Sequence, residues 1–512
     1  MKYLINRKTL SALLLFTIVV TSSCKKTFLD VNDDPNRVTD QNVTPELIFT
    51  GAEVATGARQ ATGSLTFAQN WVGYLSGVGD YAIVQEETSY NIDFGFGDVL
   101  WQGHYGVLFD LYTAKQKAMA KQDTVLAGAC MALSGKLWQE LVDMYGDIPY
   151  SEAFQNEKTR TPKYDDDKAV YDGVLKSLDT AVAYLQKTKR STFAGVDVIA
   201  KGDVTLWIKF ANTIRLRMLI RQSETPGFNP TTELASIKAS GGPLGAGESF
   251  SVNPGYVNDV NKQNPFYAQY GYTSAASPAD ANPPVRGNNY IINTLKTNQD
   301  PRLTRFFALV GGSVVGTNYG AASGNPVSTA ASKFGPGLLG ENAGTANATG
   351  PTQAQWIMTS VESMFLSAEA KARGWDIGIP YATAEAAYDS AVSESFQWLK
   401  VPNARDTASD YRANIASANW ANAGGSVTSQ AKFIAYQKYI ALTGIDALES
   451  WSDIRRLNMM PNSGYISVNP ARLSNSLPVR LLYPQSEYTT NGPNVTAEGT
   501  INQFTTKIFW QP

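Results

Sequence analysis

The chain's stock of reactive side chains is small. Among 512 residues there is one histidine, His104, and there are two cysteines, Cys24 and Cys130. Zinc sites draw most of their ligands from Cys and His at close spacing, and a Ser-His-Asp triad or a Cys-His pair would have to use the same His104. We therefore predict no catalytic residue, no metal and no cofactor, and we interpret His104 and Cys130 as packing side chains. Carboxylate chemistry and binding without catalysis stay open.

Carboxylates occur in groups, and each group has a structural explanation beside a chemical one. Residues 30–34 begin somewhat like a calcium loop, but Pro35 stands where glycine is needed and Gln41 where glutamate is needed. Residues 165–167 are three aspartates directly before a predicted helix, where acids interact favourably with the helix dipole. Two further sets could supply the acid and base of a glycoside hydrolase, namely Glu86 with Glu87, and Glu140, Asp143, Asp147 and Glu152. Acids on helix faces are ordinary, so a hydrolase is kept as an alternative.

Aromatic side chains are a better clue, because sugar rings stack on them while hydroxyl groups bond amides, carboxylates and guanidinium groups. One patch lies in a Gly-rich, irregular segment from residue 71 to residue 96, and a second spans residues 264–272, with Arg286 and Asn288-Asn289 nearby in sequence. The ligand-binding candidates from these patches are Trp71, Tyr74, Tyr81, Tyr90, Phe94, Tyr267, Tyr270, Tyr272 and Arg286. Loop packing is the alternative for each ring, and we expect only a few of them to touch ligand.

Helices must position these segments, since helical periodicity dominates the first and last thirds of the chain. Apolar residues recur with a 3.6-residue period in residues 101–112, 125–145, 171–185 and 203–221, and Thr44 with Pro45 marks an earlier helix start. Small residues such as Gly128 and Gly135 would let neighbouring helices approach closely, and Gly146 is placed as a C-cap. Further helices are predicted over residues 355–373, 383–399, 430–442 and 446–456. No clean 34-residue repeat is visible, so any helical-hairpin repeats are degenerate.

The middle of the chain has a different texture. Between about residues 222 and 355, Gly, Pro, Ser, Asn and Thr crowd together, and only residues 290–295 and 301–310 have the pattern of ordered elements. Loops this long in a compact protein are usually binding surfaces or disorder. We therefore expect an all-α scaffold with one large loop-rich, ligand-facing region.

The first residues have the features of a removable leader. Lys2, Arg7 and Lys8 precede an apolar run over residues 10–20, and Thr-Ser-Ser precedes Cys24, as in a lipoprotein signal with Thr21 in place of the usual leucine. We predict a signal peptide over residues 1–23 and a lipid anchor (palmitate among its acyl chains) on Cys24, with a plain secretory leader as the alternative. No later segment reaches 18 continuous apolar residues, so the membrane is contacted through the anchor only.

The charge balance excludes one class of partner. The chain has 43 Lys and Arg against 45 Asp and Glu, and without the leader the formal charge falls to −5. A mildly acidic surface repels phosphate backbones, so we expect no nucleic-acid binding. Charged residues are 17 % and aromatic residues 11 %, which is typical of a packed globule and not of a disordered chain.

Several segments together resemble the SusD/RagB family of nutrient-binding outer-membrane lipoproteins. The resemblance is closest to the branch with an early Asp-Pro-Asn signature, which here is Asp34-Pro35-Asn36. The matching segments run nearly end to end, at residues 24–30, 143–153, 207–212, 215–217, 368–370, 373–374, 437–442, 451–456 and 483–487. On physical grounds these motifs are mostly scaffold. Arg215, Arg217, Asp453 and Arg455 have the character of ion-pair or packing positions, and no ligand residue is carried over from the family.

The resemblance implies a single domain over residues 24–512, with a degenerate tetratricopeptide-like helical-repeat fold. It also implies an outer-membrane lipoprotein at the cell surface. Such a protein is a lid on a SusC-like TonB-dependent transporter that captures oligosaccharides or peptides without cleaving them. The function expected is thus non-enzymatic glycan binding and delivery. Peptide cargo, a lipid-anchored glycoside hydrolase and a purely structural surface protein stay open as alternatives.

Overall fold

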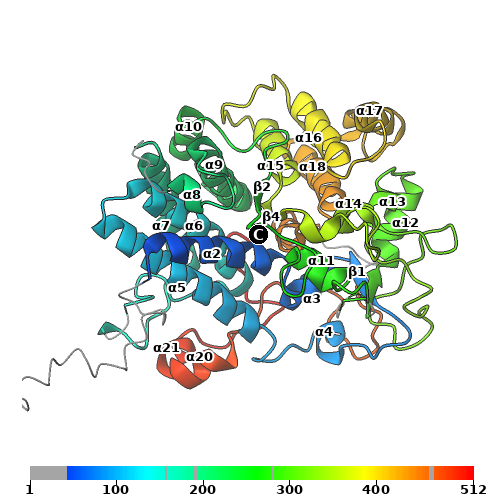
Figure 1. Ribbon diagram of the computed structural model, residues 1–512, viewed down its shortest axis with the longest axis horizontal. Helices are drawn as coiled ribbons and strands as arrows, with labels where there is room; N and C mark the ends of the chain where they lie inside the picture. The colour runs from blue at the N-terminus through cyan, green and yellow to red at the C-terminus, as the bar shows by residue number, and fades with distance from the viewer. Residues whose placement is uncertain (1–42, 156–157, 188–192, 280–281, 283, 460–465) are drawn as a thin grey trace, which may run out of the picture. The chain divides into compact units, whose positions relative to one another are not determined.

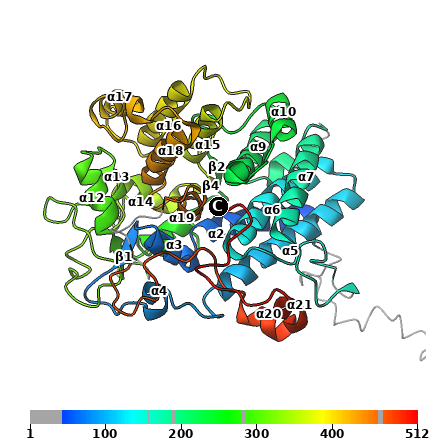
Figure 2. The same ribbon diagram turned by 180° about the vertical axis from the view of Figure 1, so that it is seen from behind.

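Two groups of long helices, joined by a loop-rich middle, make up the described part of the chain (Figures 1 and 2). The computed structural model describes residues 43–155, 158–187, 193–279, 282, 284–459 and 466–512. Residues 45–512 form one compact unit, to which the following description applies. The predicted signal peptide, Cys24 and the acidic residues 30–34 lie outside the described residues. The prediction of a mostly helical fold is confirmed.

In the first helical group, each long helix packs against its neighbours in the chain. Its long helices are α2 (Pro45–Gln60), α5 (Asp98–Ala120), α6 (Thr124–Tyr145), α7 (Asp167–Leu185) and α9 (Val204–Arg221). Short elements between them are η2 (Gly63–Leu65), α3 (Thr66–Trp71), β1 (Leu75–Gly77), α4 (Gln85–Ser89) and α8 (Phe193–Val196). The helices predicted from residues 101–112, 125–145, 171–185 and 203–221 are therefore present, and α2 begins at Pro45 as its capping signal indicates.

Aspartate caps explain where three of these helices begin. The side chains of Asp123, Asp166 and Asp203 accept hydrogen bonds from backbone N–H groups in the first turns of α6, α7 and α9. Each cap satisfies a donor that the helix itself cannot pair. The run of aspartates at 165–167 thus contains the N-cap of α7, as the sequence indicates.

Glycines on α6 allow α7 to lie unusually close to it. A Cβ atom added to Gly135 would lie 2.6 Å from Cδ2 of Leu178, and one added to Gly128 would lie 2.9 Å from the backbone oxygen of Ala181. These distances are shorter than van der Waals contact, so larger side chains would push the two helices apart. The close approach predicted from the small residues is confirmed.

The second helical group follows the loop-rich middle. Its helices are α15 (Ser360–Ala372), α16 (Ala384–Trp398), α17 (Ala404–Asn414), α18 (Val427–Ala441) and α19 (Ala447–Arg456), with the short η6 (Trp420–Asn422) before α18. The side chains of Thr359, Thr383, Ser426 and Asp446 cap α15, α16, α18 and α19. Two small helices, α20 (Gln485–Thr490) and α21 (Gly492–Ala497), lie near the C-terminal end of the chain.

One predicted helix starts too early. Residues 355–358 are a fully buried strand, β4 (Gln355–Met358), which pairs antiparallel with β2 (Phe250–Val252). The helix α15 begins only after Thr359, whose extended backbone and capping side chain start a new element. Trp356 and Ile357 suit a buried strand because bulky and branched side chains pack well on a pleated surface. A second ribbon pairs β1 with β3 (Val285–Gly287).

The middle of the chain contains more regular structure than the sequence indicates. The elements found there are η4 (Gln222–Glu224), α10 (Thr231–Ala239), β2, α11 (Pro265–Tyr270), β3, α12 (Asn289–Thr297), α13 (Leu303–Phe306), α14 (Pro336–Leu339), η5 (Gly350–Thr352) and β4. The two predicted elements correspond to α12 and α13, whereas α10 and α11 were missed. Helix α11 has only six residues, too few to show a helical period, although Asn264 and Pro265 form an N-cap signal.

Burial of large side chains ties these parts into one core. The indoles of Trp71, Trp207, Trp451 and Trp510 are completely buried, and they come from widely separated segments. Among the described residues, none of the helices has the length and apolar character needed to cross a membrane.

Candidate functional site

Asp143, one of the carboxylates that could do acid–base chemistry, belongs to a buried ionic cluster. The cluster consists of side chains from α6, α9, α15, α18 and α19: Asp143, Arg217, Arg221, Glu362, Glu369, Lys438, Glu449, Asp453 and Arg456. Arg217 pairs with Glu362 at 3.1 Å, Lys438 with both Glu449 and Asp453 at 2.6 Å, and Arg456 with Glu369 at 2.8 Å. These pairs bridge helices of both groups, so their role is structural.

The predicted ion-pair and packing positions are confirmed. Arg215 bonds Glu233 at 2.8 Å, while the guanidinium of Arg455 lies 3.8 Å from the centre of the Trp451 ring and donates to the backbone oxygens of Asp143 and Val479. Removing one partner of a buried pair leaves an uncompensated charge, which destabilises a fold strongly. These residues therefore hold helices together and do not contact ligand from solvent.

His104 and Cys130 are core side chains, as predicted. His104 is buried and bonds the backbone oxygen of Leu100 and the carboxylate of Glu140. Burial alone would raise the pKa of Glu140, but Lys136 and His104 overcome it and hold that pKa below its ordinary value. Burial also raises the pKa of the Cys130 thiol, which makes it a poor nucleophile.

The remaining acid–base candidates are dispersed. Glu87 is buried and accepts hydrogen bonds from Asn70 at 2.7 Å and Tyr319 at 3.1 Å, and burial raises its pKa to about 7. Glu86 accepts the backbone N–H of Asp93 at 2.7 Å, and Glu152 accepts that of Lys163 at 3.0 Å. Each of these carboxylates is engaged in holding its own segment.

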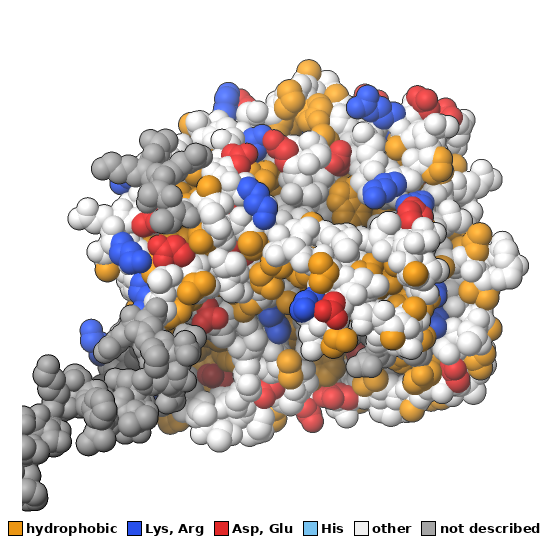
Figure 3. Space-filling model, in the orientation of Figure 1, with side chains coloured by type: hydrophobic (Ala, Val, Ile, Leu, Met, Phe, Trp, Pro, Cys, Tyr) orange, Lys and Arg blue, Asp and Glu red, His pale blue; other side chains and the backbone are white. Residues whose placement is uncertain are grey.

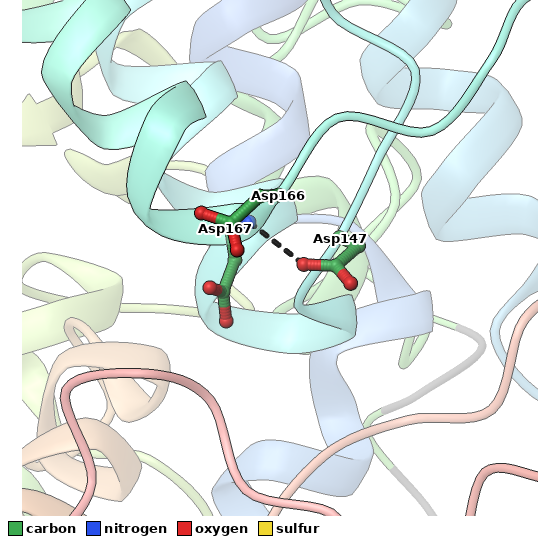
Figure 4. Close-up of side chains that lie close together, drawn as sticks. All are labelled: Asp147, Asp166 and Asp167. Atoms are coloured by element: carbon green, nitrogen blue, oxygen red, sulfur yellow. Dashed lines mark hydrogen bonds between the residues drawn. The ribbon is translucent and has the colours of Figure 1, made fainter. Parts of the chain in front are cut away.

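An acidic cluster lies at the start of α7 (Figure 4). Asp147, Asp166 and Asp167 each place a carboxylate oxygen within 4.8 Å of the others. The backbone N–H of Asp167 donates to Asp147 at 2.7 Å, and the carboxylate of Asp167 accepts the N–H of Phe509 at 2.9 Å. Burial, followed by the neighbouring carboxylates, raises the pKa of Asp167 to about 6. Backbone donors therefore account for the arrangement.

Three rings of the first aromatic patch are buried, which corrects the expectation that they face ligand. Trp71 is stacked on Phe96 with ring centres 5.8 Å apart and an interplanar angle of 5°. The hydroxyl of Tyr74 bonds the backbone oxygen of Tyr439, and that of Tyr90 accepts the N–H of Ser467 at 2.8 Å. Since Trp71, Tyr74 and Tyr90 have no exposed surface, a sugar in solution has no ring face to reach.

The other two rings of this patch are open to solvent. Tyr81 is 46 % exposed and Phe94 is 43 % exposed. Phe94 lies against Tyr488, with ring centres 4.8 Å apart, whereas Tyr81 lies in the turn that follows β1. Of the first patch, only these two side chains fit the ligand hypothesis.

The second aromatic patch is also closed, by the loop around residues 331–350. The hydroxyl of Tyr267 accepts the N–H of Gly344 at 3.1 Å, and that of Tyr270 bonds Thr66 at 2.9 Å. Lys333 lies over the Tyr272 ring, 4.4 Å from its centre. Because Tyr267, Tyr270 and Tyr272 are all buried, loop packing explains them better than ligand contact does.

Arg286 lies near the turn that contains Asp80 and Tyr81, so two predicted residues from distant segments belong to the same part of the surface. β1 and β3 pair with Gly77 opposite Val285, which brings the turn after β1 next to Arg286. Nε of Arg286 donates to the backbone oxygens of Ser328 and Ala331, and Asp80 accepts both the N–H and the hydroxyl of Ser328 at 2.7 Å. Burial lowers the pKa of Arg286, and nearby Asp80 and Tyr81 oppose that shift.

We call Asp80, Tyr81, Arg286 and Ser328 the Tyr81 surface. It combines an exposed ring with an exposed, hydrogen-bonded carboxylate, which are groups that bind sugars, whereas the Arg286 side chain is buried and holds the backbone of Ser328 and Ala331. Sequence reasoning named Tyr81 and Arg286 but missed Asp80 and Ser328. The short β1–β3 ribbon that unites them is too small to leave a sequence pattern.

Sequence reasoning also missed a hollow at another place. Trp101 and Tyr105 belong to the apolar stripe predicted for α5, and in the structure they line a surface hollow of about 640 Å³ between α5 and α20. The periodicity could not reveal it, because the opposite wall comes from residues near the other end of the chain.

Figure 3 shows acidic and basic side chains interspersed on one face of the molecule.

Comparison with known proteins places the fold. The chain is similar to the structure of a chitin-binding SusD homologue from Flavobacterium johnsoniae, with a TM-score of 0.72 and 22 % identity over 90 % of this chain and 98 % of that one. It is also similar to a SusD/RagB family protein from Bacteroides thetaiotaomicron, with a TM-score of 0.71 and 20 % identity over 92 % of this chain and 99 % of that one. No curated protein matches the sequence.

A further similar structure is described as a chitin-binding protein, with a TM-score of 0.69 and 23 % identity over 91 % of this chain and 99 % of that one. At these identities the likeness concerns the fold, which is the helical, tetratricopeptide-like fold expected from the sequence. The sequence itself matches the SusD-like family, described as "Starch-binding associating with outer membrane", over residues 35–484. Since this match covers most of the chain, the protein belongs to the SusD-like family.

Proposed function

We propose that this protein is a cell-surface lipoprotein that captures nutrient oligosaccharides and delivers them, uncleaved, to a SusC-like TonB-dependent transporter in the outer membrane. The family match over residues 35–484 carries the proposal, because that family is described as starch-binding and associated with the outer membrane. Two of the similar structures are described as chitin-binding, which supports a glycan as the ligand.

The Tyr81 surface supplies the chemistry that the proposal needs. A sugar ring would stack on the exposed face of Tyr81, and its hydroxyls would bond the exposed carboxylate of Asp80. Arg286 is buried and donates to the backbone oxygens of Ser328 and Ala331, so it supports this surface from within. Phe94 is the other exposed ring among the predicted candidates, and it lies against Tyr488 of α20 as a separate candidate contact.

The absence of catalysis is part of the proposal. Glu140 is bound by Lys136 and His104. Asp143 is bound by Arg221, Tyr171 and Trp510. A general acid needs a pKa near the working pH and access to the glycosidic oxygen. These buried, paired carboxylates lack that access.

The lipid anchor and the transporter complete the proposal. The leader and Cys24 would tether the chain to the outer membrane and leave the unit from residue 45 onward free to face nutrients and the barrel. Co-purification of the transporter from detergent extracts would test this part. The Cys24→Ala variant lacks the anchor. It is expected to fold but to purify without the transporter, because anchoring precedes assembly in this proposal.

Native affinity gels test ligand capture and catalysis together. The full chain, purified in detergent, is run through gels cast with a panel of polysaccharides that includes starch and soluble chitin derivatives. The same lanes are assayed for new reducing ends. Retardation without reducing ends is the expected result. New reducing ends would favour the hydrolase, and binding to peptides with no glycan retained would favour peptide cargo.

A further inference from the structure

The hollow between α5 and α20 lies apart from the Tyr81 surface. In both views of the molecule α20 and β1 are well separated (Figures 1 and 2). Its volume of about 640 Å³ falls in the range of about 300–1,000 Å³ that is usual for small-ligand sites. The hollow is open to solvent, and it has an aromatic floor and a polar rim.

Three rings form the floor. Phe109 is 41 % exposed, and its ring centre lies 5.8 Å from that of Phe154, which in turn lies 6.1 Å from that of Tyr105. The hydroxyl of Tyr105 donates to the backbone oxygen of Pro149 at 2.7 Å, so its ring is held in one orientation. Fixed, partly exposed rings offer apolar faces without the entropic cost of ordering a flexible side chain.

Phe154 has an unusual backbone that serves this arrangement. Its φ of +63° lies in the left-handed region, which is a strained conformation for a bulky residue. Contacts with Tyr112 and Trp138 on the other side of the ring hold it there. A second hollow of about 290 Å³ adjoins Phe154 on that side. Backbone strain of this kind persists only where the surroundings enforce it, and it is often found at functional sites.

The rim carries polar groups that are positioned but not saturated. Glu487 uses Oε2 to accept bonds from Tyr164 at 2.8 Å and Asn491 at 3.2 Å, and Glu152 uses Oε2 for the N–H of Lys163. Oε1 of each carboxylate has no hydrogen-bond partner among the described residues. Arg160 is exposed and makes no ion pair or hydrogen bond there either. Each carboxylate is thus anchored through one oxygen while the other is available to a ligand.

We propose that this hollow is a second saccharide site, which binds a short neutral oligosaccharide. Rings of the sugar would lie on Phe109 and Phe154, with hydroxyl groups bonded to Glu152, Glu487 and Arg160. The ligand is neutral because the rim has two carboxylates and one guanidinium, a balance that disfavours anionic sugars. This inference rests on the proposed function, since it adds a second site for the same class of ligand.

Calorimetric titration of the full chain in detergent tests the second site. The probes are two neutral trisaccharides, chitotriose and maltotriose, and an anionic galacturonic-acid trisaccharide. The variants are Phe109→Ala, Arg160→Ala and Tyr81→Ala. Val427→Ala is the matched control, because Val427 is equally exposed and lies on α18, away from both surfaces. Wild type is expected to bind one of the probes at two sites per chain.

Phe109→Ala is expected to weaken one of the two sites by about tenfold or more, which is the loss typical of a deleted stacking ring. Arg160→Ala, which changes an exposed side chain and is safe for folding, is expected to weaken the same site by about threefold to tenfold. Tyr81→Ala should weaken only the other site, and Val427→Ala neither.

The outcomes separate this inference from the proposed function. Unchanged titrations of both Phe109→Ala and Arg160→Ala, with Tyr81→Ala impaired, would overturn the second site and leave the proposed function standing. If Phe109→Ala loses affinity at one site while Tyr81→Ala binds like wild type, the result would support the hollow as a saccharide site and contradict the Tyr81 surface as one. No binding of either trisaccharide to wild type, or tighter binding of galacturonic-acid trisaccharide at the hollow, would overturn the inference as stated.

Discussion

Two aromatic regions of this molecule use the same residue types in opposite ways. Around Trp71, the rings of Phe67, Tyr90, Phe96 and Trp451 enclose the indole completely. In the other region, the rings of Tyr105, Phe109 and Phe154 stay partly exposed opposite α20. The difference lies in which other segments pack over the rings, and not in the rings themselves. Aromatic density alone therefore does not identify a ligand site.

The cover over Trp71 comes from far along the chain. Trp451 belongs to α19, and Ser467 and Tyr319 bond the neighbouring Tyr90 and Glu87. The side of the Tyr105 region that faces solvent lies opposite residues 159–162 and the small helix α20, and it stays open between them. Closed aromatic groups of the first kind contribute stability through burial, whereas open ones of the second kind keep that surface for a partner.

The largest effect is expected from Trp71→Ala. The indole is fully buried and lies against several rings, so its removal should destabilise the fold by about 3–5 kcal/mol. Urea unfolding of wild type and variant measures this difference. Phe94→Ala is the matched control, since that ring is 43 % exposed and its loss should cost less than about 1 kcal/mol. Equal stability of Trp71→Ala and wild type would contradict the enclosed character of this region.

A smaller effect, with a pH signature, is expected from Glu87→Gln. Burial raises the pKa of Glu87 to about 7 in the folded chain, above the ordinary value of 4.5. Between these values the folded state binds more protons than the unfolded state, so the contribution of Glu87 to stability is lost as pH rises from about 4.5 through about 7.

The glutamine variant lacks this titration. Its stability relative to wild type should therefore increase by about 1–3 kcal/mol between pH 5 and pH 8. Urea unfolding of wild type and variant at both pH values gives the comparison. A difference between variant and wild type that is the same at pH 5 and pH 8 would contradict a buried, neutral Glu87.

At the exposed Tyr81 ring, substitution by alanine should change ligand affinity and not the stability of the fold. The ring is 46 % exposed, so unfolding by urea should shift by less than about 0.5 kcal/mol. Affinity for the retained oligosaccharide should fall by about tenfold, as for the loss of one stacking ring. Affinity gels and urea unfolding on the same preparation measure both quantities. A variant with wild-type affinity would remove the Tyr81 surface as the ligand site.

The smallest effect is expected from Phe94→Ala. Phe94 is exposed and touches Tyr488 on α20, away from the β1–β3 ribbon. We expect a loss of affinity of about threefold or less, measured on the same gels as Tyr81→Ala. A loss larger than that of Tyr81→Ala would move the centre of the ligand site from the β1–β3 ribbon towards α20.

Long periodic helices were predictable from the sequence, and short elements were not. Helices α6, α7 and α9 have enough turns to show both their apolar face and their aspartate caps. The sequence of β4 resembles the start of a helix, because the run of buried residues continues from β4 into α15. α10 and α11 were missed because nine and six residues show too little of a helical period.

The ligand surface was only partly predictable. Trp71 and Tyr81 look alike in sequence, since both stand in an irregular, aromatic segment. What separates them is the cover from α19 and from residues near 319 and 467, which sequence reasoning could not place. Arg286 is close in sequence to the second patch, yet the β1–β3 ribbon pairs it with Ser76, near the segment of the first patch that contains Tyr81.

The most direct test of glycan capture is the affinity gel with the full chain, run beside Tyr81→Ala and assayed for reducing ends. We predict that at least one polysaccharide retards wild type, that Tyr81→Ala migrates faster in the same gel, and that no reducing ends appear. Retardation accompanied by released reducing ends, or migration of wild type unaffected by every polysaccharide, would contradict capture without cleavage.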